Sequence, residues 1–196
     1  MATILCDMDS IISDFYFQIL EDHCFETGED LPPEHIDTWD KKIGKQTMIH
    51  YFGAPGFFRR LRPIEGAESV LKWLSDNGQE VVIVSSATLP NAPGEKLGWL
   101  AEHYPWLSKN RIIFAAEKWR VKGDFLIDDS PDNVSDYRKY HPGAKLLGIA
   151  YPYNDLRISK KAQLAPWDLL APSYRDTNAA WSVIQGALSV WLGIKL

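Results

Sequence analysis

Acidic side chains follow two of the apolar runs of this chain, at the point where each run ends. Asp7 and Asp9 come directly after the first apolar run, and the pair Asp128 and Asp129 comes directly after a later Phe-Leu-Ile run. Burying these carboxylates close together without compensation would cost several kcal/mol for each of them. Such a group therefore requires a cation, and hard oxygen donors without soft ones favour Mg²⁺.

A bound Mg²⁺ with open coordination positions suits phosphate chemistry. An aspartate beside the ion can attack phosphorus and form an aspartyl phosphate. The second carboxylate of the Asp7 and Asp9 pair, two residues on, would point to a different side and stay off the metal. There it could protonate the leaving alkoxide and then activate water. The acidic pairs thus predict a phosphatase with a covalent intermediate.

Each of these motifs has a simpler interpretation when it is taken alone. Acidic turns after strands are common, and the pair Ser85 and Ser86, which ends a β-branched run, is typical of an ordinary strand exit. Two adjacent acids at a buried strand end, Asp128 and Asp129, have no simple structural purpose. The three motifs together, each at the end of a strand, are much more specific than any one of them.

The elements that must position these residues alternate along the chain. The predicted strands lie at residues 2–6, 80–84, 111–115, 124–127 and 144–150, and the predicted helices at 11–20, 63–77, 95–103, 132–140 and 177–192. This alternation predicts an α/β protein with a Rossmann-like parallel sheet flanked by helices, in which ligands bind at the carboxyl ends of the strands. Residues 156–175 carry little periodicity.

One segment interrupts this alternation. Residues 29–63 contain repeated prolines and glycines that allow only short elements. We interpret this segment as a small, mainly helical cap that is inserted after the first strand and helix. The expected division is a core domain made of residues 1–28 and 64–196 and a cap subdomain made of residues 29–63.

The composition limits the classes of function. The 196 residues are 45% hydrophobic and 24% charged, which excludes a disordered chain. The net charge of −5 has the wrong sign for a protein that wraps duplex nucleic acid. No apolar run approaches the roughly 18 residues of a membrane span, and acidic residues interrupt the opening segment, so we expect a cytoplasmic protein. A homodimer is one of the assemblies open to the chain.

Four segments of the sequence are similar to motifs of one known family. These are DMDSIISDF at residues 7–15, APGFF with the residues that follow it at 54–67, GEK with Trp99 and His103 at 94–103, and EKWRVKGDFLIDD at 117–129. With them the chain resembles the 5'(3')-deoxyribonucleotidase family of the haloacid dehalogenase superfamily over most of residues 3–154. The resemblance implies that superfamily's fold and a phosphatase activity.

The resemblance also implies roles for the acidic residues. Asp7 would be the nucleophile and a metal ligand. Asp9 would be the acid and base, and its main-chain carbonyl would also bind the metal. Asp129 matches the direct metal ligand, and Asp128 would support it through water or through Lys118.

Further residues match the family's substrate contacts. Lys118 aligns with the lysine that neutralises the phosphate and the nucleophile, and Lys122 is its rival for that role. Ser85 takes the position of a phosphate-binding threonine, with Ser86 beside it. Phe15 matches an aromatic side chain that faces the nucleotide base.

The cap and the first motif are where the sequence leaves most open. Trp39, Tyr51 and Phe52 are candidates to stack on the base, although the same residues could simply hold a small cap together. Ser10 replaces the family's usual glycine directly after the acidic motif. If this position needs a positive φ, serine carries a modest strain; otherwise its hydroxyl is a new polar group beside the phosphate.

The sequence therefore predicts a Mg²⁺-dependent phosphatase of nucleoside monophosphates, with 5'(3')-deoxyribonucleotides as the expected substrates. A second hypothesis keeps the chemistry and changes the substrate to another small phosphomonoester, such as a sugar phosphate or phosphoserine. A third hypothesis is a nucleotide-binding regulator without useful turnover.

Overall fold

The computed structural model describes residues 1–36, 42–43, 45–155 and 163–196. Its centre is a six-stranded sheet with the strand order β5-β4-β1-β6-β7-β8. Each pair of neighbouring strands is parallel. The strands are β1 (Thr3–Cys6), β4 (Glu80–Ser85), β5 (Ile112–Phe114), β6 (Phe125–Ile127), β7 (Lys145–Ile149) and β8 (Leu169–Ala171). The predicted parallel α/β architecture is confirmed.

Helices cover both faces of this sheet. They are α3 (Ala67–Asp76), α4 (Ala92–His103), α5 (Pro131–Tyr140) and α7 (Thr177–Leu192). Ile4 and Cys6 of β1 are buried together with side chains of α3, α4 and α7, whereas Leu5 is buried together with Val134 and Tyr137 of α5. Successive side chains of a strand point to opposite faces, so a strand covered on both faces must be apolar throughout. None of the helices within the described residues is long and apolar enough to cross a membrane.

The first helix begins later than the sequence predicts. Its periodicity starts at Ile11, but α1 spans Phe15–Thr27. The main-chain N–H groups of Ile12 and Ser13 instead donate to the carbonyl oxygen of Met8, at 2.9 and 3.0 Å, and form a tight turn after β1. Ser10 lies in this turn with a φ of 59°, so the position does require the left-handed conformation that glycine adopts more easily.

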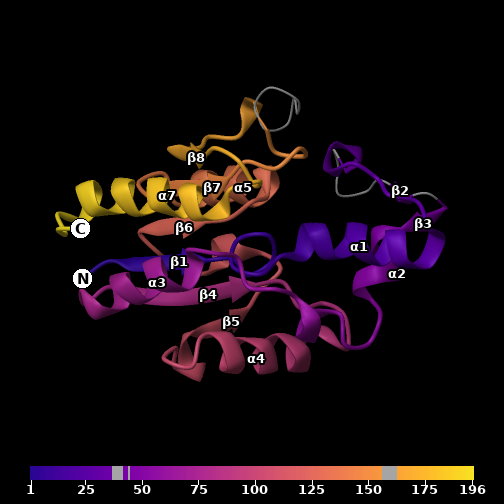
Figure 1. The fold of residues 1–196 in the computed structure, drawn as a ribbon. Helices are drawn as coiled ribbons and strands as arrows, with labels where there is room; N and C mark the ends of the chain where they lie inside the picture. Colours follow the sequence, from indigo (N-terminus) through magenta and orange to yellow (C-terminus); the bar gives the residue numbers. More distant parts are fainter. Residues whose placement is uncertain (37–41, 44, 156–162) are drawn as a thin grey trace.

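The described elements of residues 29–63, the segment expected to form a cap, lie beyond the carboxyl ends of the strands, on the side opposite the two termini (Figure 1). They are the strands β2 (Lys42–Ile43) and β3 (Gln46–Thr47), the helix α2 (Met48–Phe52) and the 3₁₀ turns Pro33–His35 and Phe58–Arg60. The two strands form an antiparallel hairpin. Helix α2 packs against α1, which leads into the cap from the core. These elements therefore lie at the edge of the sheet at which the strand order predicts a ligand.

Strand β8 lies in the region that carries little periodicity in the sequence. Three residues are too few to show an alternating pattern, and side-chain contacts of Asp168 fix the strand instead. The Asp168 carboxylate accepts hydrogen bonds from the Leu146 N–H at 2.9 Å and the Lys145 ammonium at 2.9 Å, and it also pairs with Arg138. The Asp168 N–H donates to the Leu146 carbonyl at 2.9 Å, which aligns β8 with β7.

Replacing this carboxylate should give a pH-dependent loss of stability. Burial raises the pKa of Asp168, but the hydrogen bonds from Leu146, Lys145 and Arg138 outweigh this effect and leave the pKa below its ordinary value. The stabilisation is therefore complete above the unfolded pKa of about 3.9 and is lost as the pH falls through the folded pKa. We expect Asp168→Asn to lower the free energy of unfolding by about 1 kcal/mol at pH 7.

Urea unfolding at pH 7 and at pH 3 measures this effect. The difference between wild type and Asp168→Asn should shrink at pH 3, because the wild-type carboxylate is then losing its charge. Asp136→Asn, at an exposed position of α5, is the matched control and should leave stability unchanged at both pH values. An equal difference at the two pH values would show that the charge of Asp168 does not stabilise the fold.

Candidate active site

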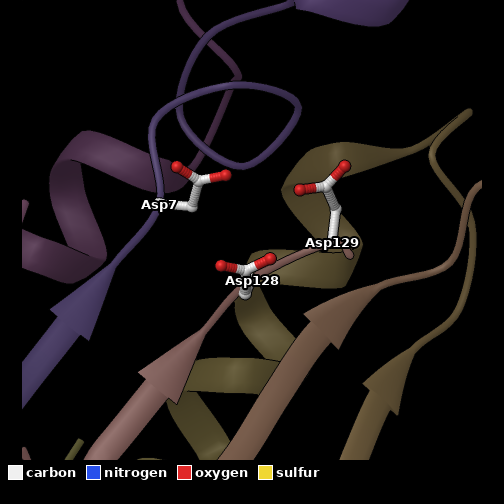
Figure 2. Close-up of side chains that lie close together, drawn as sticks. All are labelled: Asp7, Asp128 and Asp129. Carbon is white, nitrogen blue, oxygen red and sulfur yellow. The ribbon is translucent and has the colours of Figure 1, made fainter. Parts of the chain in front are cut away.

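Three carboxylates meet at the carboxyl ends of two neighbouring strands. Asp7 follows β1, and Asp128 and Asp129 follow β6 (Figure 2). Because β1 and β6 pair in parallel with Cys6 opposite Ile127, the residues that come next on each strand are held together. Each of the three residues is buried and offers one carboxylate oxygen, and these oxygens lie within 4.8 Å of one another. The sheet thus brings Asp7 together with Asp128 and Asp129, which stand 121 and 122 positions further along the chain, as the sequence predicts for strand ends.

Lys118 supplies a positive charge to this group. Its Nζ lies 2.7 Å from Asp7 Oδ1 and 2.6 Å from Asp128 Oδ2, and the residue is only 3% exposed. Burial disfavours the charged ammonium, but Asp128 and Asp7 outweigh that effect and raise the pKa of Lys118 above its ordinary value. Lys122, the rival in the sequence, is exposed. The lysine beside the acidic group is therefore Lys118.

Three carboxyl groups in this cluster share the charge of Lys118. Burial and the neighbouring Asp128 and Asp7 raise the pKa of Asp129 well above its ordinary value. Asp128 has further partners, since its Oδ1 accepts hydrogen bonds from Ser130 N at 2.9 Å and from Asn133 Nδ2 at 3.0 Å. A buried set of oxygen donors with surplus negative charge fits a divalent cation, and the absence of sulfur and nitrogen donors from the three side chains fits Mg²⁺.

The carboxylate of Asp9 lies apart from this group and pairs with a second lysine. Lys96 donates to Asp9 Oδ2, to Ser85 Oγ at 2.9 Å and to the Ser86 carbonyl oxygen at 2.8 Å. Lys96 is 1% exposed, so its ammonium is committed to these contacts. Burial raises the pKa of Asp9 above its ordinary value, and the charge of Lys96 counters only part of that effect. A carboxyl group of this kind suits proton transfer.

Sequence analysis did not single out Lys96 as a site residue. The lysine stands on the buried face of α4 together with Ala92, Trp99 and Leu100. Residues three or four positions apart lie on the same face of a helix, so a lysine among apolar residues at this spacing must have a buried partner. That pattern is the sequence signal for Lys96, which is the last residue of the GEK motif.

The two serines at the end of β4 have different surroundings. Ser85 is fully buried, and its hydroxyl accepts the hydrogen bond from Lys96. Ser86 is exposed and lines a cavity together with Thr88. Thr88 is not among the site residues that the sequence predicts. The structure therefore places Ser86 at the cavity and Ser85 behind it.

This cavity joins the charged groups to aromatic side chains. Its volume is about 430 Å³. The charged residues that line it are Asp7, Asp9, Asp129, Lys96 and Lys118. Phe15, Phe52 and Phe58 line it as well. One space therefore offers contacts for a phosphate and contacts for a flat apolar group.

The aromatic candidates differ in their positions. Phe15 and Phe52 contact each other with ring centroids 5.5 Å apart, and Phe58 lies 6.2 Å from Phe15 in a stacked arrangement. Tyr51 is buried and does not line the cavity; its hydroxyl lies 2.8 Å from His23 Nδ1, which favours the interpretation that it holds the cap together. Trp39 lies outside the described residues. Phe58 was missed as a candidate, although it belongs to the APGFF motif.

Helix α4 connects the cap with the charged groups. The carboxylate of Glu95 accepts hydrogen bonds from Gly56 N at 2.7 Å and from Phe58 N at 3.0 Å. The indole N–H of Trp99 donates to the Leu61 carbonyl oxygen at 2.7 Å. The helix that supplies the second lysine therefore also fixes the chain segment that leads from the cap back to the core.

Known proteins resemble this chain over most of its length. The family model described as "5' nucleotidase, deoxy (Pyrimidine), cytosolic type C protein" matches residues 1–168. The 5'(3')-deoxyribonucleotidase of Bacillus subtilis (strain 168) is 29% identical over 157 residues, which cover 77% of this chain and 86% of that protein. The 5'(3')-deoxyribonucleotidase of Bacillus phage SPbeta has the same identity and coverage.

A solved structure extends the likeness to the whole fold. The haloacid dehalogenase family hydrolase from Deinococcus radiodurans R1, which holds phosphate and sodium, superposes with a TM-score of 0.63. It is 16% identical and covers 97% of this chain and 96% of its own, so this likeness concerns the fold alone. The chain therefore belongs to the 5'(3')-deoxyribonucleotidase family, it has the fold of the haloacid dehalogenase hydrolases, and it is a hydrolase of phosphoric monoesters.

Proposed function

We propose that this protein is a Mg²⁺-dependent phosphatase that acts on nucleoside monophosphates, with 5'(3')-deoxyribonucleotides as its preferred substrates. One observation carries this proposal: a cavity of about 430 Å³ joins the carboxylates and lysines to three phenylalanines. The charged part suits a phosphate, and the aromatic part suits a nucleobase. The matching family is described as cytosolic, which supports the cytoplasm as the proposed location.

The acidic group fits the proposed metal ion. Asp7 and Asp129 would hold Mg²⁺ together with the main-chain carbonyl of Asp9, and Asp128 would support them through its contact with Lys118. When bound, the ion would act as a Lewis acid that draws charge from the phosphate oxygens. It would also balance the surplus negative charge of the buried carboxylates.

The chain's own side chains account for the two chemical steps. A carboxylate oxygen of Asp7 attacks phosphorus, the bond between phosphorus and the sugar oxygen breaks, and Asp9 gives its proton to that oxygen. Asp9 then takes a proton from water, whose oxygen attacks the phosphorus and releases Asp7 and inorganic phosphate. Lys118 stays protonated in both steps and stabilises negative charge on the transferring group.

Lys96 has a positioning role in this proposal. Its hydrogen bonds to Asp9, Ser85 and the Ser86 carbonyl tie the proton-transferring carboxyl group to the end of β4. A carboxyl group held in this way keeps a fixed distance from the proposed nucleophile Asp7, which follows β1. Ser86 and Thr88 line the same cavity and are the proposed hydroxyl contacts of the substrate.

Phosphate release from a substrate panel tests the proposal. The panel contains ribonucleoside and deoxyribonucleoside monophosphates, with a sugar phosphate and phosphoserine as controls, each assayed with Mg²⁺ and with EDTA. We expect Mg²⁺-dependent release that is fastest with deoxyribonucleotides. Faster release from a control substrate would support the phosphatase chemistry but reject nucleotides as the preferred substrates. Nucleotide binding without any phosphate release would indicate a regulator.

The aromatic part of the cavity makes a separate prediction. We expect Phe52→Ala to raise KM for deoxyribonucleoside monophosphates roughly tenfold, because stacking of a base on an aromatic ring contributes about 1–3 kcal/mol. KM for glycerol phosphate, which has no base, should stay unchanged. Phe25→Ala is the matched control, since Phe25 is 92% exposed and does not line the cavity. An equal increase in KM for both substrates would show that Phe52 has a purely structural role.

A further inference from the structure

Two residues of the loop after β7 donate hydrogen bonds to Asp129, and the sequence did not indicate either of them as a site residue. The Tyr153 hydroxyl donates a hydrogen bond to Asp129 Oδ2, and the Asn154 side-chain Nδ2 donates to the Asp129 carbonyl oxygen at 2.7 Å. All three residues are buried. One loop therefore fixes both the carboxylate and the main chain of Asp129.

The loop itself is rigidly built. Asn154 Nδ2 also donates to the Ile149 carbonyl oxygen at 3.0 Å, and its Oδ1 accepts from Tyr151 N at 2.6 Å. The ring of Tyr153 is stacked on that of Tyr151 at 5.5 Å and contacts Tyr16 at the same centroid distance. The Tyr153 ring thus has little freedom to turn its hydroxyl away from the carboxylate.

Asp129 needs such a partner because of its neighbours. Asp128 and Asp7 carry the same charge and lie within 4.8 Å of it, measured between ligand oxygens, while Lys118 contacts those two carboxylates directly. Repulsion would turn an unrestrained Asp129 side chain away from the group. A neutral hydroxyl bonded to one carboxylate oxygen fixes the rotation of the side chain and leaves the other oxygen for a cation.

We propose that Tyr153 is a positioning residue of the metal site, which holds Asp129 in the orientation that receives Mg²⁺. This inference rests on the proposed function, because it assumes that Asp7, Asp128 and Asp129 form a metal site. Ser10, which stands where the family motif has glycine, lies beside the Tyr153 phenol.

Direct binding of Mg²⁺ to the Tyr153→Phe variant tests the inference without relying on activity. Isothermal titration calorimetry with Mg²⁺, and electron paramagnetic resonance of free Mn²⁺, measure Kd in the intact protein. We expect Kd to rise about tenfold or more, as is usual when the hydrogen-bond partner of a metal ligand is removed. Tyr151→Phe is the matched control, because it removes a hydroxyl from the neighbouring buried ring, and its Kd should equal that of the wild type.

A second measurement separates positioning from general damage to the fold. Phosphate release by Tyr153→Phe should recover when Mg²⁺ is raised in proportion to its Kd, whereas a misfolded variant would not recover. Wild-type Mg²⁺ binding with an unchanged Kd for Tyr153→Phe would overturn this inference alone. A wild-type protein that binds no Mg²⁺ would overturn the metal site of the proposed function and this inference with it.

Discussion

Asp7→Asn is expected to reduce phosphate release by a factor on the order of 10⁴ or more, because a carboxamide cannot replace the attacking carboxylate. Asparagine has nearly the same shape as aspartate, and Lys118 keeps its contact with Asp128 at 2.6 Å. The fold should therefore survive the substitution. The loss should appear in kcat, since the substrate would still meet the cavity and the lysines.

The measurement has two parts. Steady-state release of phosphate gives the rate, and incubation with a ³²P-labelled nucleotide followed by acid quenching shows whether label remains on the protein. Wild type should trap labelled protein and Asp7→Asn should not. Asp136→Asn on the exposed side of α5 controls for loss of a carboxylate elsewhere. Label retained by Asp7→Asn would exclude Asp7 as the nucleophile.

Lys118→Met should affect both activity and stability. Without the ammonium, Asp7 and Asp128 remain buried and lose a partner that lies within 2.7 Å of each. Breaking a buried ion pair by removing one partner costs about 3–5 kcal/mol, and we expect a loss of this size in metal-free protein. Phosphate release should fall by about 10²–10³-fold, which is typical when one preorganised charge at a reacting centre is removed.

Urea unfolding in EDTA and in Mg²⁺ distinguishes this effect from a simple packing defect. Mg²⁺ should restore part of the lost stability, because a bound cation compensates the same carboxylates. Lys122→Met is the matched control, since Lys122 is exposed four residues further along the chain, and it should behave as wild type. Unchanged stability of Lys118→Met in EDTA would show that the buried carboxylates do not depend on this lysine.

The convergence of the acidic residues could be predicted from the sequence because it depends on two local facts. Asp7 and Asp128 each follow a short apolar run, and the ends of parallel strands meet at one edge of a sheet. No knowledge of distant contacts was needed beyond the order of the elements. The same logic correctly placed α7 at Thr177–Leu192, where a long amphipathic pattern leaves little ambiguity.

The parts that could not be predicted depend on contacts between distant segments. Lys96 is separated from Asp9 by 87 positions, and only the packing of α4 beside the sheet brings them together. Tyr153 lies in a loop without periodicity, so nothing local indicates that its hydroxyl reaches Asp129. Strand β8 is fixed by Asp168 and not by its own pattern. In each case the local structure depends on polar contacts between segments that are distant in the sequence.

Helix α4 can affect substrate selectivity through two adjacent residues, Glu95 and Lys96. Glu95 binds the main chain of residues 56–58 in the cap's return segment, and Lys96 binds the carboxyl group of Asp9. Since both side chains leave the same turn of one helix, a displacement of that segment would be transmitted to Asp9, the proposed proton donor. A poorly fitting substrate would then be disfavoured twice, first as it docks and again as its ester bond breaks.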